Sequence, residues 1–438
     1  MYESSEPGAQ PHVLLLATQP WPVGARLGLA LRTVGFRVSI WCPHANVLLL
    51  TGVAHRHYPY RLLDPVGSLE EAVLAGGPDL IVPCDEPATI DLQQLADRAR
   101  AAPHLAPVLH AIEYSLGSAA NLKRLTERAY VLKTAADGGA AVPASAAIAT
   151  SADLRAWLNA NGFPAYLKAD GTFAALGVRQ VHTYEEAEAA FRALHAPPRA
   201  ATTMNRMIFH RDPSLWSPLL ARHRPAVSVQ RSVPGVDVNS TIFCWRGRVL
   251  ASLTMQVVTV RYRFGPSTVL RRIHNAGMDR TAEILAARLN LSGFYGLDFI
   301  LEEQTGIAWL LEMNSRATQI PHLALGPGHD LPAAAFAAIT GLPLRPRPAV
   351  TNEDTIALFP QEWNRDPASP LIRSAYHDVP WESPTLVRAC ISQPLDLRRL
   401  ASPATLRRAV SLNYWRQRKL QRLQAATSVA TEIASRLP

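Results

Sequence analysis

The sequence predicts an α/β fold at the N-terminus, followed by an α+β region and a C-terminal extension. The first hundred residues alternate short apolar runs with stretches of helical spacing, which is the βαβ rhythm of a parallel sheet covered by helices. Beyond residue 226, apolar and polar residues alternate, as they do in antiparallel strands. Hydrophobic residues make up 48% of the 438 residues and charged residues 18%, a balance typical of a packed protein rather than a disordered one.

The predicted helices and strands divide into an N-terminal and a middle group. The N-terminal group has strands over 12–17, 36–41 and 79–83 and helices over 23–34 and 90–98. The turn after its first strand, 19–24, lacks GxGxxG, so a dinucleotide fingerprint is absent. The middle group has helices over 118–136, 151–159, 184–194 and 279–289, strands over 146–149, 164–168, 178–181, 226–233, 238–245 and 249–258, and a hairpin over 294–302 and 307–314.

Proline marks the C-terminal extension. Ten prolines fall between Pro343 and Pro403, too many for regular helices or central strands, so we expect an extended segment draped over a preceding domain. A helix is predicted after it, over 403–437. The patterns together predict an N-terminal domain over 1–115, a second domain over 116–345 that divides into subdomains over 143–225 and 226–345, and the extension over 346–438.

The net charge of +9 is concentrated at the C-terminus. Residues 392–438 hold nine Arg or Lys against two acidic residues, a charge of +7, which leaves +2 for the rest of the chain. The amphipathic spacing around Trp415 favours a helix that packs on the body or on a second subunit. Binding to nucleic acid or to an anionic membrane is the alternative. Because no nucleic-acid motif occurs elsewhere, we expect no nucleic-acid partner.

The cysteines and the apolar runs indicate in which cellular compartment the protein is expected. The four cysteines lie far apart with no CxxC pair, which disfavours a zinc ribbon or a disulfide scaffold and favours the reducing cytoplasm. No apolar run approaches the roughly 18 residues of a membrane-spanning helix. Residues Glu3 and Glu6, without a basic segment, argue against a secretory signal. A cytoplasmic protein without a membrane span is therefore expected.

The most informative motif is the hairpin over 294–314. Side chains alternate faces along a strand, so Glu312 and Asn314 share one face while Met313 takes the other. Asp298, on the paired strand, can lie opposite them. Two carboxylates and an amide oxygen are the hard ligands that Mg²⁺ prefers, and Mg²⁺ usually shares itself with substrate phosphates. The hairpin thus predicts a magnesium–nucleotide site, the alternative being a solvated acidic edge.

Two further motifs are compatible with a nucleotide. Lys168 ends a predicted strand and supplies a point charge for phosphate oxygens, and the small-residue loop 169–177 after it allows backbone N–H groups to approach phosphates. Further on, the segment 229–237 stops a strand at Pro234-Gly235 and resumes at Asp237. Such a connector can bind an adenine ring through backbone groups and ribose hydroxyls through the carboxylate. Each motif alone also fits an ordinary turn.

The order of these motifs resembles the ATP-grasp superfamily over roughly residues 12–345. The resemblance implies an ATP-grasp fold with a Rossmann-like N-terminal domain, and a ligase that uses ATP and two Mg²⁺ ions, with Mn²⁺ able to substitute. Such enzymes convert a carboxylate into an acylphosphate, which an amine, or less often a thiol, attacks. The expected partners are therefore a small carboxylate and a small amine.

The resemblance also assigns roles by position. Lys168 would contact the α- and β-phosphates, and Arg316 would face the transferred phosphate or the substrate carboxylate, which makes these two the candidate catalytic residues. Asp298, Glu312 and Asn314 would bind magnesium, with Glu312 bridging two ions. The remaining nucleotide contacts would come from Gly171, Thr172 and Gly177 of the lid, from Gln230, Arg231 and Val233 of the adenine pocket, and from Asp237 at the ribose.

One further basic residue is expected before the turn at Gly139–Pro143. Arg128 is favoured for it and Lys123 is the competing choice. Two departures from the family pattern stand out: the lid is poor in glycine, and Arg231 occupies a position where an acidic residue is common. The first suggests a stiffer or more apolar lid, and the second leaves adenine recognition to backbone groups or signals reduced affinity for ATP.

Three functions remain open, and the first is favoured. It is a carboxylate–amine ligase acting on amino acids or small peptides, a class suggested by the family and by arginines beside aromatic residues over 260–272. The second is a carboxylase or carbamoyl-phosphate-type enzyme, disfavoured because no biotin-carrier motif or glutaminase domain is present. The third is a non-catalytic nucleotide-binding module whose basic tail recruits a partner. The sequence is compatible with a homodimer and leaves the oligomeric state open.

Overall fold

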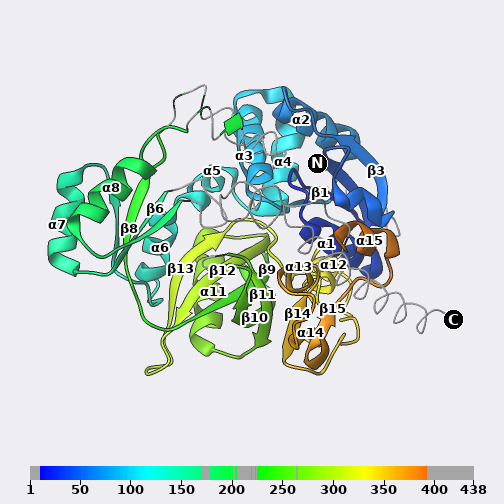
Figure 1. Cartoon of the computed structure of the whole chain (residues 1–438). Helices are drawn as coiled ribbons and strands as arrows, with labels where there is room; N and C mark the ends of the chain where they lie inside the picture. The colour runs from blue at the N-terminus through cyan, green and yellow to red at the C-terminus, as the bar shows by residue number, and fades with distance from the viewer. Residues whose placement is uncertain are drawn as a thin grey trace, which may run out of the picture.

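The computed structural model describes residues 10–169, 177–198, 200, 203–204, 219, 222, 224–262 and 265–391. Predictions that concern Gly171, Thr172, most of the lid loop and the helix over 403–437 lie outside these residues. Three sheets organise the described chain, and Figure 1 shows them as an N-terminal lobe, a projecting lobe that carries α7 and α8, and a large central sheet.

The N-terminal lobe is a parallel four-stranded sheet in the order β3-β2-β1-β4, as the βαβ rhythm predicts. Its strands are β1 (His12–Leu16), β2 (Arg37–Cys42), β3 (Ala54–Pro59) and β4 (Leu80–Pro83). Every residue of β1 is buried, because both faces of the sheet are covered. The helices are α1 (Pro22–Val34), α2 (Pro65–Gly76), α3 (Glu86–Ala101) and α4 (Ala106–Leu116).

The two faces of β1 point into different cores. Val13 and Leu15 belong to a core that includes α1, and Leu14 and Leu16 belong to one that includes α2, α3 and α4; both cores also include residues of the central sheet. The N-terminal lobe is therefore joined to the central sheet by a continuous apolar core. This joint fixes the carboxyl ends of β1 and β4, where ligands of open parallel sheets bind.

The projecting lobe is a four-stranded antiparallel sheet in the order β5-β8-β6-β7 with its own core. Two helices, α7 (Ser151–Asn161) and α8 (Tyr184–Leu194), pack on it. Thr150 caps α7 through a reciprocal capping box with Asp153. The strands are β5 (Ser145–Ile148), β6 (Ala165–Ala169), β7 (Val178–Val181) and β8 (Val227–Arg231).

The central sheet has seven strands in the order β13-β12-β9-β10-β11-β14-β15. The strands from β13 to β14 pair antiparallel, and only β15 pairs parallel. Helices α11 (Ala276–Leu289) and α12 (Leu331–Thr340) contribute to the two cores on either side of it. The strands are β9 (Val236–Trp245), β10 (Arg248–Val260), β11 (Ser267–Arg272), β12 (Gly293–Leu301), β13 (Ala308–Asn314), β14 (Thr355–Leu358) and β15 (Tyr376–Asp378).

The single helix predicted over 118–136 is wrong, because the chain forms three short pieces there. These are α5 (Ala119–Leu122), a 3₁₀ turn over Arg124–Thr126 and α6 (Arg128–Asp137). The carbonyls of Leu122 and Leu125 accept hydrogen bonds from the side chains of Gln93 and Ser315. Tertiary donors thus take carbonyls that a continuous helix would use, and Arg128 becomes the first residue of α6.

The expectation of an extended, draped segment after residue 345 is also wrong. Within it, β14 lies inside the central sheet beside β11, and β15 pairs with β14. Three helices follow or separate these strands: α13 (Gln361–Arg365), α14 (Leu371–Ser374) and α15 (Pro384–Ile391). Pro360, Pro370 and Pro384 lie at the starts of these helices, where a missing N–H costs nothing.

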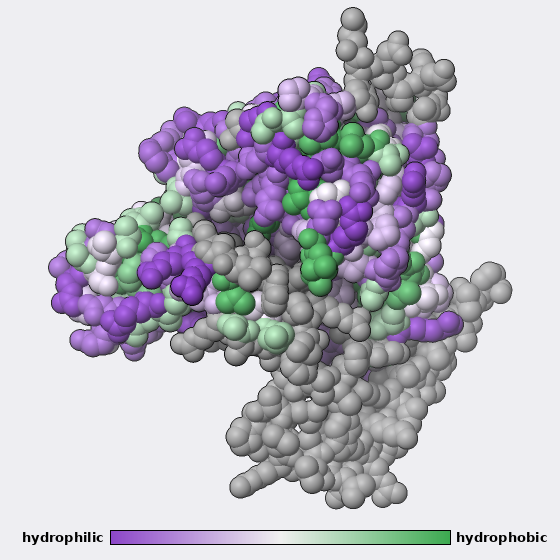
Figure 2. All heavy atoms as spheres, turned by 90° about the horizontal axis from the view of Figure 1, so that it is seen from above, coloured by the Kyte–Doolittle hydropathy of each residue, from purple (hydrophilic) through white to green (hydrophobic). Residues whose placement is uncertain are grey.

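Among the described residues visible in Figure 2, polar residues dominate and apolar residues form small separate groups. The exposed large hydrophobic side chains of the described residues are likewise scattered along the chain, from Leu50 to Val350. Among the described residues, no helix is both long enough and apolar enough to cross a bilayer.

Candidate functional site

The hairpin β12–β13 places the three predicted metal ligands together. Asp298 and Glu312 are direct cross-strand partners, and Asn314 lies opposite Gly296, two residues along on each strand. The amide Nδ2 of Asn314 donates to Oδ2 of Asp298 at 2.8 Å. All three side chains are half-buried. Two carboxylates and an amide therefore converge on one face, as strand alternation predicts.

Gly296 allows the loop after β13 to close over this hairpin. A Cβ at Gly296 would lie 2.2 Å from Cγ2 of Thr318, so alanine could not be accommodated without displacing that side chain. The hydroxyl of Thr318 shares a 2.7 Å hydrogen bond with Thr241 of β9. The close packing fixes the chain that leads from Asn314 through Arg316.

Three cationic side chains surround the hairpin carboxylates. Arg128, at the start of α6, donates from Nη2 to Oε2 of Glu312 at 2.8 Å and from Nε at 3.3 Å. Lys168 is buried and donates from Nζ to Oε1 of Gln230 at 2.7 Å. Arg316 donates from Nη2 to Oδ1 of Asn314 at 3.1 Å. Lys123, the competing choice for the first basic residue, is exposed.

The pKa shifts show how closely these charges interact. Burial lowers the pKa of Lys168 to about 8, with the charge of Glu312 opposing the shift. Burial and then the charge of Glu312 raise the pKa of Asp298 to about 7. Burial also disfavours the ionised form of Glu312, but Arg128 and Lys168 outweigh it and lower its pKa to about 2. Glu312 is thus the carboxylate that stays ionised.

Glu86 is a member of the site that sequence reasoning missed. Its Oε2 lies 3.4 Å from Nε of Arg316, although 230 residues separate the two in the chain. Asp85, the N-cap of α3, accepts from the backbone N–H groups of Thr18 and Gln19 and thereby ties the ends of β1 and β4 together. The available signal was the acidic pair at the carboxyl end of a predicted parallel strand.

The end of β8 presents alternate side chains to opposite faces, and the connector to β9 follows it. Gln230 is buried towards Lys168, whereas Arg231 is exposed and Val233 is half-buried. Within the described residues, the buried Nε2 of Gln230 has no hydrogen-bond partner. A buried amide donor without a partner fits a ligand acceptor such as a ring nitrogen.

Asp237 and Gly177 are the remaining predicted nucleotide contacts within the described residues. Partial desolvation raises the pKa of Asp237 while the charge of Lys168 opposes the shift, so these two side chains are electrostatic neighbours. Gly177 closes the base of the loop after β6, where its carbonyl accepts from the N–H of Ala169 at 2.9 Å. Gly171 and Thr172 lie outside the described residues.

The donor set fits a magnesium ion that shares its coordination with other oxygens. No group of three or more His, Cys, Asp or Glu side chains suited to a metal occurs in the described part of the chain. The hairpin offers two carboxylates and one amide, which is the few-ligand arrangement of Mg²⁺ sites completed by water and phosphate. It does not resemble an all-protein cage for a structural metal.

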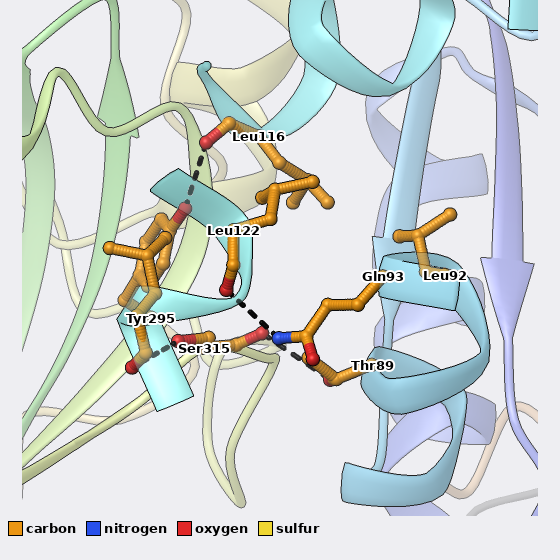
Figure 3. Close-up of a pocket in the computed structure, with 8 residues that line it drawn as sticks. Thr89, Leu92, Gln93, Leu116, Leu122, Tyr295 and Ser315 are labelled. Atoms are coloured by element: carbon orange, nitrogen blue, oxygen red, sulfur yellow. Dashed lines mark hydrogen bonds between the residues drawn. The ribbon is translucent and has the colours of Figure 1, made fainter. Parts of the chain in front are cut away.

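A small cavity lies behind the hairpin, at the junction of α3 with the central sheet (Figure 3). Its volume of about 10 Å³ holds roughly one water molecule, so it cannot accept a substrate. Figure 3 shows Tyr295 donating to the carbonyl of Leu116, and Gln93 reaching Leu122. Thr89 also contacts the carbonyl of Ser315, which links α3 to the residue between Asn314 and Arg316.

Comparison with known proteins gives matches at the level of structure only. No protein-family model matches the chain, and no curated protein matches it. Among solved structures, an N5-carboxyaminoimidazole ribonucleotide synthetase in complex with ADP aligns with a TM-score of 0.54 and 14% identity, over 78% of this chain and 80% of that one.

Two further structures align as well. A carboxyaminoimidazole ribonucleotide synthase from Aspergillus clavatus, complexed with ATP, has a TM-score of 0.54 and 15% identity over 77% of this chain and 78% of that one. The biotin carboxylase domain of the 2-oxoglutarate carboxylase of Hydrogenobacter thermophilus, in complex with MgADP, ADP and bicarbonate, has a TM-score of 0.54 and 14% identity over 77% and 71%. At these identities the likeness concerns the fold.

Proposed function

We propose that this chain, which has the ATP-grasp fold, is an ATP-dependent ligase that phosphorylates a carboxylate and joins it to an amine. The observation that carries the proposal is the convergence of Asp298, Glu312 and Asn314 with three cations contributed by other parts of the fold. A site that had lost its activity would be expected to lose some of these side chains. The set is complete.

The nucleotide would lie between the projecting lobe and the central sheet. Lys168 and Arg128 would bind its phosphates, and the unpartnered Nε2 of Gln230, with backbone groups up to Val233, would bind the adenine. Asp237 would hold the ribose hydroxyls. Gly171, Thr172 and Gly177 would belong to the lid that excludes water from a readily hydrolysed acylphosphate.

The hairpin would hold the metal. Asp298, Glu312 and Asn314 would bind Mg²⁺, or Mn²⁺ in its place, with Glu312 between two ions. The metal would supply charge neutralisation at the phosphate oxygens. The hairpin's own contribution is rigidity, because both strands are fixed in the sheet and Thr318 locks the loop that follows.

Arg316 is the proposed contact for the reacting groups. A carboxylate that approaches a triphosphate meets like-charge repulsion, and a guanidinium next to both can neutralise it and hold two oxygens at once. Glu86 and Asn314 contact Arg316 and would orient it. Glu86 would thereby connect the carboxyl end of β4 to the part of the site where Arg316 would bind the reacting groups.

A carboxylase that phosphorylates bicarbonate is the second candidate. The observation that favours it is that a structural neighbour was crystallised with bicarbonate and MgADP. A non-catalytic nucleotide-binding module is disfavoured by the complete set of charged side chains. A homodimer and small-molecule acid and amine substrates complete the proposal.

Phosphate release from ATP separates these functions. The purified chain is incubated with Mg–ATP and pooled amino acids, short peptides or bicarbonate, and products are identified by mass spectrometry. The ligase predicts phosphate release that depends on an acid and an amine, with an amide product. The carboxylase predicts release with bicarbonate. No release above the Glu312→Gln background in any pool would contradict an enzymatic function.

A further inference from the structure

Arg128 occupies the metal-binding face of Glu312. Its Nη2 and Nε lie 2.8 and 3.3 Å from the same oxygen, Oε2. The Arg128 side chain is 12% exposed and that of Glu312 33% exposed, so the pair is shielded from much of the solvent. The guanidinium therefore supplies the positive charge that a metal ion would otherwise provide to this carboxylate.

The other two proposed ligands are engaged as well. The amide nitrogen of Asn314 donates to Asp298, and its amide oxygen accepts from Arg316. A divalent cation that enters must therefore displace protein donors from its own ligands. The exchange at Glu312 is the costly one, because it separates a partly buried charge pair.

We infer that, because of Arg128, this site binds a divalent cation more tightly when the cation arrives with a polyphosphate than when it arrives alone. The inference rests on the proposed function. A free cation would break the Arg128–Glu312 pair and lie close to the displaced guanidinium, with Lys168 also near. A triphosphate supplies new acceptors for Arg128, so the guanidinium moves from Glu312 to a phosphate as the metal replaces it.

The exchange couples two ligands through one side chain. Because coupling free energies are reciprocal, the phosphate strengthens metal binding by as much as the metal strengthens phosphate binding. Arg128 is the first residue of α6, after the extended backbone of the N-cap residue Glu127, and its side chain reaches Glu312 from the start of the helix. A guanidinium offers several donors in a fixed fork, so it can pass from a carboxylate to a phosphate without losing its geometry.

Mn²⁺ binding to the nucleotide-free full chain tests the inference. The affinity is measured by the loss of the free Mn²⁺ electron paramagnetic resonance signal for the unmodified chain, Arg128→Gln and Arg280→Gln. Arg280 is exposed on α11, so its removal changes the net charge equally without touching the site. We expect Arg128→Gln to bind Mn²⁺ about tenfold more tightly or better, and Arg280→Gln to match the unmodified chain.

Equal Mn²⁺ affinity in Arg128→Gln and the unmodified chain would overturn the inference, as would an equal gain in Arg280→Gln. Thermal unfolding verifies that each variant is folded, and Arg128→Met, which fills similar space without charge, repeats the comparison if the glutamine variant does not fold. Arg128→Lys keeps the charge and should stay within about threefold of the unmodified chain, since one charge is retained.

A second titration uses Mn²⁺ with ATP. The unmodified chain should bind the complex more tightly than Arg128→Gln does, the opposite order from the free ion. Tighter or equal binding of the complex by Arg128→Gln would contradict the exchange. Failure of the proposed function is a different result: the unmodified chain would not bind the Mn²⁺–ATP complex, whereas the nucleotide-free titration does not depend on ATP.

Discussion

Two buried charge clusters in this molecule have similar members and different surroundings. In the hairpin cluster, Glu312 meets Arg128 with the carboxylate side chain 33% exposed. In the second cluster, Asp378 of β15 meets Arg26 of α1 and His322, and all three side chains are less than 10% exposed. The hairpin cluster is open to a ligand, while the second is closed and joins the C-terminal extension to the N-terminal lobe.

In the second cluster, each oxygen of the carboxylate has a charged or ionisable partner. Arg26 donates to both the backbone carbonyl and Oδ1 of Asp378, and His322 lies 2.8 Å from Oδ2. Burial disfavours ionised Asp378, but Arg26 and His322 outweigh it and lower its pKa. The comparison teaches that burial of a charge does not mark a site. Access for a ligand does, because a buried nitrogen without a hydrogen-bond partner occurs in both places among the described residues, at Nε2 of Gln230 and at Nδ1 of His322.

Glu312→Gln should give the largest effect, on activity far more than on stability. The amide keeps the shape of the side chain but removes the charge that the metal needs, so turnover should fall by about 10³-fold or more. The variant should still fold, with a smaller loss of unfolding free energy than Asp378→Ala, because the Arg128–Glu312 pair is only partly buried. Steady-state phosphate release and urea unfolding measure the two quantities. Full activity in this variant would show that Glu312 is not a metal ligand.

Asp378→Ala should have the opposite profile. Removing one partner of a buried ion pair leaves Arg26 buried without its carboxylate, which costs about 3–5 kcal/mol of unfolding free energy. Chemical denaturation measures the loss, and Asp97→Ala, which removes an exposed carboxylate paired with Arg100, is the control. An unchanged unfolding free energy would mean that this cluster does not hold the extension in place.

The pH dependence of ATP affinity should reflect Lys168. Its pKa is lowered from the usual 10.5 to about 8, so the ammonium is present at pH 7 and is lost as the pH rises through 8. We expect ATP affinity to fall by about tenfold between pH 7 and pH 9, the value of one charge-assisted hydrogen bond. Isothermal titration calorimetry measures it.

The matching variants make this pH prediction specific. Lys168→Met should bind ATP weakly at both pH values, and its ATP affinity should no longer depend on pH in this range. Lys133→Met, which changes an exposed lysine paired with Asp137, should keep the slope of the unmodified chain. A slope that persists in Lys168→Met would assign the titration to another group.

Features of the site that depend on residues close together in the sequence could be predicted, whereas contacts between distant segments could not. The convergence of the hairpin side chains was predictable because Glu312 and Asn314 are two residues apart and strand alternation places them on one face. Lys168 was predictable as the end of an apolar strand. The contact between Glu86 and Arg316 was not, because it spans 230 residues and depends on how two lobes pack. The extension was misjudged because the count of prolines says less than their positions at helix starts.

The smallest effect is expected from substitutions of two neighbouring residues on opposite faces of β8. Gln230→Met should weaken ATP binding by about threefold to tenfold, because Lys168 loses its acceptor and the adenine loses an amide donor. Arg231→Gln should change the affinity by less than about twofold, since an exposed charge contributes little. Calorimetry at pH 7 compares both with the unmodified chain. If Arg231→Gln proved the more damaging, the strand would present its other face to the nucleotide, and the adenine pocket would have to be placed on the opposite side of the sheet. Equal effects would instead mean that backbone groups of the connector, rather than either side chain, provide the recognition.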